Sequence, residues 1–176
     1  MNYHKIEKTS VANGTGIRVV LWVSGCSLHC KGCHNPETWG LNSGKLFDEE
    51  AKKELFESLD KPYIQGITFS GGHPLENENA ETVYLLIKEI KEKFPTKDIW
   101  LYTGYTLEQI FPTVVTSDLN LSRFYRQEII KMCDVVVDGK YIEELRDITL
   151  KWKGSSNQRV IDINKSLNEK NIVLYN

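Results

Sequence analysis

Short apolar runs that alternate with longer amphipathic stretches constrain the fold of this chain more than any other feature. The runs are rich in β-branched residues and are almost continuously apolar. They lie at Ile17–Ser24, Gly66–Ser70, Asp98–Gly104, Asp134–Gly139 and Gln158–Ile163, with a shorter sixth candidate at Ile172–Tyr175. Such runs are typical of strands covered on both faces, as in a parallel sheet. The alternation therefore predicts an α/β protein built from about six successive βα units.

The stretches between the runs predict helices. Asp48 is a suitable N-cap for a helix with acidic residues in its first turn. A second helix ends before Pro95, and its apolar residues share one face: Val83, Leu86, Ile87 and Ile90. Two shorter candidates follow, "TLEQI" and "SRFYRQEIIKM", and we expect Ser122 to cap the second of these.

Length and charge restrict the class of protein. A chain of 176 residues predicts a single domain over residues 1–176. The formal net charge of −2 argues against binding nucleic acid through a basic face. The first residues, "MNYHKIEKTS", contain no apolar leader, and no apolar run approaches the roughly 20 residues that span a bilayer. We therefore expect a cytoplasmic protein with neither nucleic-acid nor membrane partners.

Four loops follow the apolar runs and carry most of the reactive or conformationally unusual residues. They are "GCSLHCKGCHN", "SGGHP", "TGYT" and "DGKY". Because the carboxyl ends of parallel strands meet at one edge of a sheet, we expect these loops to lie together.

The first loop holds Cys26, Cys30 and Cys33 in a C-x3-C-x2-C pattern. In a reducing cytosol such cysteines are ligands or reactive groups more often than disulfides. A structural zinc site needs four ligands, and His29 and His34 each adjoin a cysteine, where sharing one tetrahedral metal is difficult. An iron–sulfur cubane held by three thiolates would leave one iron open to a small molecule. A distorted zinc site and unliganded thiols remain as alternatives.

The three cysteines together with "SGGHP" resemble the radical S-adenosylmethionine (SAM) superfamily. In that superfamily the open iron of a [4Fe-4S] cluster chelates SAM, and a Gly-Gly turn contacts the methionine amine. The resemblance implies that Cys26, Cys30 and Cys33 are catalytic metal ligands. It also implies that Ser70, Gly71 and Gly72 bind SAM, since glycine lets the backbone approach a ligand closely.

Longer blocks narrow the resemblance. "GTGIRVVLWVSGCSLHCKGCHNPETW" resembles the branch that activates glycyl radical enzymes, and "CKGC", "YTGYT", "VVVDGKY" and "GSSNQRVID" are similar to the family that activates anaerobic ribonucleotide reductases. The resemblance implies a partial, open (βα)6-type radical SAM barrel. It implies reductive cleavage of SAM and formation of a glycyl radical on anaerobic ribonucleoside-triphosphate reductase, the protein substrate. It also implies a reduced flavodoxin-like electron donor. A short, incompletely closed barrel leaves its radical facing solvent, so we expect the docked reductase to shield it.

One position departs from the superfamily pattern. An aromatic or apolar residue usually precedes the third cysteine and helps to hold the adenine, whereas this chain has Gly32. We expect the adenine contact to come from elsewhere, such as the backbone around His34.

Several other residues have both a functional and a structural interpretation. Thr103 (with Tyr105 and Thr106) and Asp138 could contact SAM, or could cap helices and turns. His73 could reach the site or lie on a surface loop. Arg18 is expected in an ion pair near the SAM carboxylate, since an unpaired buried arginine is costly. The remaining three expectations are packing roles for Trp22 and Trp39, a buried Cys133 and a solvated Arg159.

Three rival functions remain at this point. The first is activation of another glycyl radical enzyme of the pyruvate formate-lyase type. The second is a radical SAM synthase acting on a small molecule. The third is a nonenzymatic iron–sulfur or zinc protein, which would need a fourth protein ligand and would not bind SAM.

Overall fold

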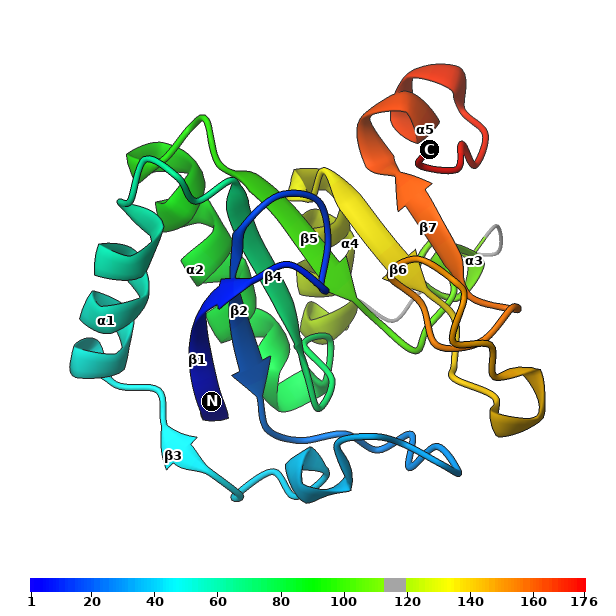
Figure 1. Cartoon of the computed structure of the whole chain (residues 1–176), viewed down its shortest axis with the longest axis horizontal. Helices are drawn as coiled ribbons and strands as arrows, with labels where there is room; N and C mark the ends of the chain where they lie inside the picture. The colour runs from blue at the N-terminus through cyan, green and yellow to red at the C-terminus, as the bar shows by residue number, and fades with distance from the viewer. Residues whose placement is uncertain (113–119) are drawn as a thin grey trace.

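A computed structural model describes residues 1–112 and 120–176. Within these ranges seven strands form one open sheet in the order β3-β1-β2-β4-β5-β6-β7 (Figure 1). The strands are β1 (Asn2–Ser10), β2 (Arg18–Val23), β3 (Lys45–Leu46), β4 (Gly66–Gly71), β5 (Asp98–Tyr102), β6 (Val135–Asp138) and β7 (Arg159–Asp162).

The centre of the sheet is parallel, as the apolar runs predict. β2 pairs with β4, β4 with β5, and β5 with β6, all in parallel register. Most residues of these strands are buried, and none is exposed. The four loops that follow β2, β4, β5 and β6 therefore emerge at one edge of the sheet.

The outer strands depart from the predicted βα repetition. β1 and β7 run antiparallel to their neighbours β2 and β6, and β3 is antiparallel to β1. The prediction of about six parallel units is therefore wrong at both sides of the sheet. The connection from β6 to β7 contains only the 3-10 helix η2 (Glu143–Leu145), and no long crossover helix turns the chain around. The candidate strand at 172–175 makes a single bridge, between Ile161 and Leu174.

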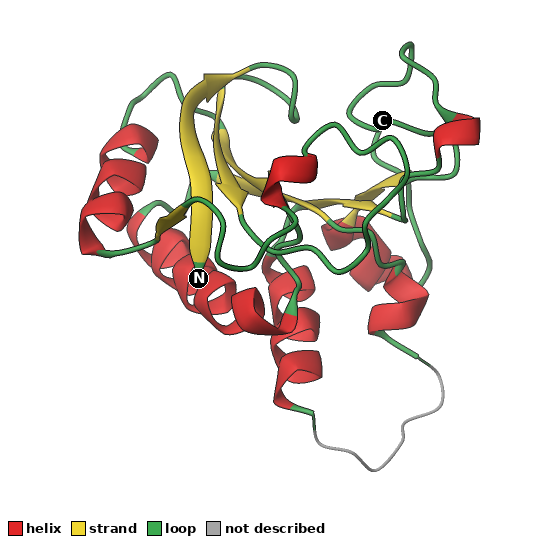
Figure 2. Cartoon of the chain, turned by 90° about the horizontal axis from the view of Figure 1, so that it is seen from below, coloured by secondary structure: helices red, strands yellow, loops and turns green. Residues whose placement is uncertain are grey.

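The helices are α1 (Glu49–Leu59), α2 (Asn77–Lys93), α3 (Leu107–Ile110), α4 (Leu121–Met132) and α5 (Ile163–Glu169). Figure 2 shows the long helices gathered on one face of the sheet. Asp48 caps α1 as predicted, because its side chain accepts a hydrogen bond from the Ala51 N–H at 2.9 Å. The expected cap at Ser122 is wrong: Asn120 caps α4 and accepts from the Ser122 N–H at 2.9 Å. No helix of the described residues is long and apolar enough to cross a bilayer.

The two faces of the sheet have separate cores. Alternate residues of the parallel strands pack against α1, α2 and α4 and form the larger core. On the other face a smaller cluster is built from Trp100, Val135, Val137 and Val160, and Trp152 and Tyr175 pack against it. Cys133 belongs to the larger core, so the expectation of a buried thiol is confirmed.

Candidate functional site

The cysteine loop (residues 24–35) leaves the carboxyl end of β2 and ends at the 3-10 helix η1 (Pro36–Thr38). Two backbone bonds close its base: the Gly25 N–H donates to Thr38 O at 2.7 Å and the Cys26 N–H to Trp39 O at 3.0 Å. The backbone is left-handed at His29 (φ 42°) and at Gly32 (φ 74°). The chain therefore turns sharply between successive cysteines, which keeps all three on one compact loop.

All three loop cysteines are free thiols of intermediate exposure. Burial raises the pKa of Cys26, against the opposing effect of the Leu28 and His29 N–H groups. Burial also raises the pKa of Cys30, and the nearby Lys140 ammonium opposes this shift. Metal binding requires the thiolate form, so binding here would release protons.

The loop suits a cluster better than a single ion. Among the described residues, no group of three or more His, Cys, Asp or Glu side chains is arranged to hold one metal ion. Each thiolate of a cubane binds a different iron, so its ligands do not converge on one point. The rings of the two neighbouring histidines lie against tryptophans: the His29 ring is 4.6 Å from Trp39, and His34 meets Trp22 edge-on at 6.5 Å. Three thiols free of disulfides on one loop are therefore a donor set that fits an iron–sulfur cluster.

The glycine turn (residues 71–73) lies directly against the cysteine loop. Gly71 has φ 105°, and a Cβ there would lie 2.6 Å from the Val23 backbone. A Cβ on Gly72 would lie 2.5 Å from the carbonyl oxygen of Gly25. The Gly72 N–H donates to Val23 O at 2.8 Å and the His73 N–H to Gly25 O at 2.7 Å. Both glycines are thus needed for packing of the two loops, whatever they contact in addition.

A chain of hydrogen bonds joins three of the four loops. The carboxylate Oε1 of Glu76 accepts from the Ser27 N–H at 2.9 Å and from the Ser27 hydroxyl at 2.7 Å. The same oxygen lies 3.2 Å from Nδ1 of His73, whose Nε2 lies 2.8 Å from Oγ1 of Thr103. The hydrogen bond from His73, together with those from Ser27, lowers the pKa of Glu76 to about 2. Burial lowers the pKa of His73, so its ring is neutral near pH 7.

This hydrogen-bonded chain changes the interpretation of two predicted residues. His73 is only 1% exposed, so it does not lie on a surface loop, and Thr103 is buried beneath it. Thr103 also accepts from the Tyr105 N–H at 3.1 Å. Thr106 caps α3 in a capping box with Gln109, which is the structural role considered for it.

Beside the cysteine loop lies a cavity of about 490 Å³ at the carboxyl ends of β5 and β6. Its wall includes Leu28 of the cysteine loop, Tyr105 and Thr106 after β5, and Asp138 and Lys140 at the end of β6. A cavity next to the cysteines, with mixed apolar and polar walls, is suited to a nucleoside-sized ligand. Of the predicted SAM-binding residues, Asp138 lines this cavity, whereas Ser70, Gly71, Gly72, His34 and Thr103 do not.

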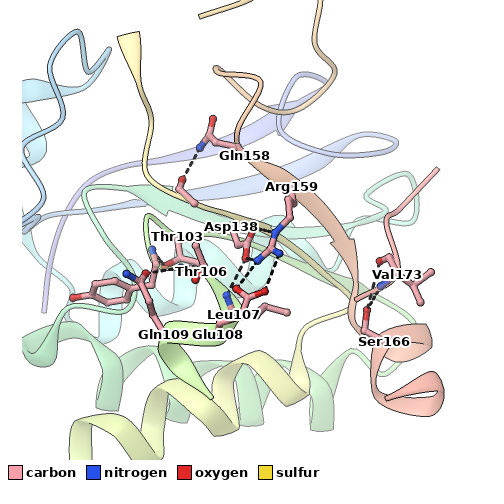
Figure 3. A network of polar contacts seen from close by, with 12 residues as sticks. Thr103, Thr106, Leu107, Glu108, Gln109, Asp138, Gln158, Arg159, Ser166 and Val173 are labelled. Carbon is pink, nitrogen blue, oxygen red and sulfur yellow. Dashed lines mark hydrogen bonds and ion pairs between the residues drawn. The ribbon is translucent and has the colours of Figure 1, made fainter. Parts of the chain in front are cut away.

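The carboxylate of Asp138 is already engaged (Figure 3). It accepts from Arg159 at 2.9 and 2.5 Å and from the Leu107 N–H at 2.9 Å. Arg159 also binds both oxygens of Glu108, at 2.9 and 2.8 Å, and lowers the pKa of Glu108 to about 2. The expectation of a solvated Arg159 is therefore wrong. Arg159 connects β7 to α3 and keeps Asp138 in the wall of the cavity.

Arg18 is ion-paired, but at the wrong end of the sheet for contact with the site. It is completely buried at the start of β2 and pairs with Asp98 at the start of β5. The cysteine loop leaves the opposite end of β2. The expected ion pair is thus present, whereas its expected place near the SAM carboxylate is wrong.

The structure supplies a reason for the departure at Gly32. A Cβ at this position would lie 1.9 Å from the carboxylate of Glu143, which accepts a hydrogen bond from the Tyr141 hydroxyl at 2.6 Å. The Glu143 side chain would have to move to admit a side chain at residue 32, and the φ of 74° at this position also favours glycine. His34 is exposed on the cysteine loop, and Asn35 lies 3.2 Å from its ring.

Sequence reasoning missed Ser27, Glu76 and Lys140 as parts of the site. Glu76 stands three residues after His73, at the start of a helix, where an acidic residue normally indicates only favourable interaction with the helix dipole. Lys140 lies in "DGKY", yet nothing in the sequence places its charge beside Cys30.

Comparison with known proteins agrees with this geometry. A family model described as a 4Fe-4S single cluster domain matches residues 12–161. A relative from Enterobacteria phage T4 is 43% identical over 160 residues, covering 91% of this chain and 93% of its own. Relatives from Escherichia coli K12 (38%, covering 91% of this chain and 97% of theirs) and Vibrio cholerae (39%, 90% and 96%) carry the same name. That name is anaerobic ribonucleoside-triphosphate reductase-activating protein. The chain therefore belongs to the family of anaerobic ribonucleoside-triphosphate reductase-activating proteins and carries a 4Fe-4S single cluster domain.

Proposed function

We propose that this chain is the enzyme that activates an anaerobic ribonucleotide reductase, a radical SAM oxidoreductase that leaves a glycyl radical on its partner. The observation that carries the proposal is the cysteine loop itself. Three free thiols lie at the carboxyl end of the first parallel strand, next to a glycine turn and a nucleoside-sized cavity, in a chain of this family.

The residues of the site have different roles in the proposed reaction. Cys26, Cys30 and Cys33 would hold the cluster. When bound there, the cluster would supply the single electron for reductive cleavage of SAM, the chemistry by which a hydrogen atom is removed from a glycine of the reductase. The backbone of Gly71 and Gly72 lies beside the cysteine loop, where polar groups can meet the methionine end. The cavity along Leu28, Thr106 and Lys140 receives the nucleoside end.

The mixed sheet is the core of a partial, open radical SAM barrel. Four parallel strands place their loops at one edge, and the antiparallel β1 and β7 border them without closing a ring. An open barrel cannot by itself shield a reactive radical from water, and the docked reductase provides the missing cover. A reduced flavodoxin-like protein in the cytoplasm is the proposed electron donor.

Activation of a pyruvate formate-lyase-type enzyme is the nearest rival. The relatives from the phage and both bacteria are named for the ribonucleotide reductase, and none of them for another glycyl radical enzyme. A small-molecule synthase needs a closed pocket, whereas the cavity beside the cysteines is open to solvent.

The test is anaerobic reconstitution with iron and sulfide, followed by mixing with an anaerobic ribonucleotide reductase, dithionite and SAM. We expect about four irons per chain, 5′-deoxyadenosine, and the doublet of a glycyl radical on the reductase in electron paramagnetic resonance. Alanine at Cys26, Cys30 or Cys33 should abolish all three.

Cys133→Ala is the matched control, because it removes a cysteine that lies in the core instead of on the loop. It should keep the cluster and the doublet. Zinc in place of iron, or SAM cleavage that survives loss of a loop cysteine, would refute the proposal. A doublet on pyruvate formate-lyase alone would establish the rival.

A further inference from the structure

We infer that Glu76 is a positioning residue that locks the cysteine loop onto the glycine turn and thereby sets the affinity for SAM. The inference rests on the proposed function. It concerns a residue that neither the cysteine motif nor the glycine signature includes.

Glu76 makes the contact with the cysteine loop through one buried oxygen. Its side chain is almost fully enclosed, and Oε1 accepts from both the N–H and the hydroxyl of Ser27, the residue after Cys26. Hydrogen bonds to a charged acceptor are stronger than those between neutral groups. The carboxylate therefore fixes the backbone that immediately follows the first cysteine.

His73 extends this contact to the loop after β5. The ionised carboxylate of Glu76 can only accept, so Nδ1 of His73 carries the proton and donates to Glu76. In the neutral ring Nε2 then accepts from the Thr103 hydroxyl, and Thr103 in turn accepts from the Tyr105 N–H. Every polar group in this series of hydrogen bonds has a partner, so the network is rigid and specifies one arrangement of the three loops.

Asn79 adds a second connection from the same end of α2. Its side-chain amide donates to Ser24 O at 2.7 Å and to His73 O at 3.1 Å. Together with the His73 N–H bond to Gly25 O, these contacts hold both ends of the Ser24–Ser27 segment against the glycine turn.

This arrangement sets the distance between two groups that must bind one ligand together. In the proposed site the cluster on the cysteine loop and the glycine turn would together bind the methionine part of SAM. A displacement of either group separates the two contacts and weakens the binding of SAM, whereas the cluster and its ability to supply an electron do not change. Loss of Glu76 should therefore raise the KM for SAM and leave kcat nearly unchanged.

The experiment compares Glu76→Ala, Glu76→Gln and Glu78→Ala in the reconstituted enzyme, with 5′-deoxyadenosine formation as the readout. Glu78 lies two residues further on, is exposed, and carries the same charge, so it controls for charge and for helix position. We expect Glu76→Ala to raise the KM for SAM about tenfold, as for loss of one buried polar partner. Glu76→Gln retains an acceptor oxygen and should restore the KM to within about threefold of wild type, and Glu78→Ala should match wild type.

A loss of folded or iron-loaded enzyme lowers the apparent kcat without changing the KM, so this split separates positioning from stability. If Glu76→Ala does not fold, Ser27→Ala replaces it, because Ser27 is exposed and the variant removes only the hydroxyl bond. It should raise the KM about threefold. An unchanged KM in the folded variant, or an equal rise in Glu78→Ala, would overturn the inference.

Amide hydrogen exchange of the cluster-free chain separates this inference from the proposed function. Glu76→Ala should accelerate exchange of the Ser27 amide, and Glu78→Ala should not. If wild-type enzyme fails to cleave SAM, the proposed function is wrong, yet slow exchange at Ser27 that depends on Glu76 would still establish the contact. Exchange that is equally fast in wild type and Glu76→Ala would refute it.

Discussion

The Arg18–Asp98 pair allows a sharp test, because Arg18 is the largest charged side chain among the described residues that has no exposure at all. The substitution is Asp98→Ala. It leaves the guanidinium with its neutral acceptors, Oγ1 of Thr68 at 2.9 Å and the carbonyl oxygens of Thr15 and Ile67 at 3.0 and 2.9 Å. The ring of Trp100, 5.2 Å away, contributes an additional attraction.

The expected cost follows from these contacts. Removing one partner of a buried pair typically costs about 3–5 kcal/mol, because the other charge stays buried without compensation. Here the hydrogen bonds from the guanidinium to its neutral acceptors survive, and the side chain of Asp98 is 24% exposed, so water can enter where the carboxylate was. We therefore expect the lower end, about 3 kcal/mol, for Asp98→Ala. Asp98→Asn keeps an acceptor oxygen and should cost about half as much.

The assay is urea unfolding of the cluster-free chain at neutral pH, together with SAM cleavage by the reconstituted variants. The double variant Arg18→Met/Asp98→Ala buries no charge and should be more stable than Asp98→Ala alone. Since the pair lies at the end of β2 away from the cysteine loop, the folded fraction should cleave SAM at the wild-type rate. A loss below about 1 kcal/mol in Asp98→Ala, the range of an exposed pair, or a double variant less stable than the single, would refute the reasoning.

Three further predictions concern the site. Gly32→Phe should destabilise the cluster-free chain by about 1–3 kcal/mol, since φ is 74° and the Glu143 side chain lies in the space that the new side chain needs. Thermal unfolding measures the loss, and adding Glu143→Ala to Gly32→Phe should recover part of it. Full wild-type stability of Gly32→Phe would contradict this prediction. Because the pKa of Glu76 falls from 4.5 to about 2 on folding, its contribution is complete above pH 4.5 and is lost as the pH falls towards 2. Glu76→Gln should flatten the acid limb of the unfolding free energy in that window, and an unchanged limb would argue against the shift. In the native cluster-free chain a thiol reagent should modify the loop cysteines and leave Cys133 unreacted until denaturation, as its exposure of 1% requires.

The apolar runs were sufficient to predict the parallel centre of the sheet. β2, β5 and β6 form within the predicted ranges and β4 extends one residue beyond its range, to Gly71, because strands buried on both faces are continuously apolar. β1 was missed because "NYHKIEKTS" consists mostly of polar and charged residues, and the strand is only partly buried in the structure. The direction of β7 could not be predicted either, since an apolar run has the same composition in both orientations.

The residues of the candidate site also divide into those that a local sequence pattern predicts and those whose contacts only the fold shows. Cys26, Cys30 and Cys33 form a local pattern, so their spacing alone indicated a cluster, and Gly71 and Gly72 were found through a second local pattern. The ligand roles of these residues and of Ser70, His34, Thr103 and Asp138 stay predictions. The partners of Asp138 and Thr103 lie far away in the sequence, and only the packing of loops shows that Arg159 and His73 occupy them.

The sequence by itself determined the order of the central elements and the spacing on which the predicted chemistry of the cysteine loop rests, because both depend on residues close together in the chain. The tertiary structure alone decided which buried polar groups satisfy one another. Ser27 and Glu76 are 49 residues apart, and Arg18 and Asp98 are 80 apart. A buried charge must find a partner wherever the fold brings one, and no local pattern records which partner that is.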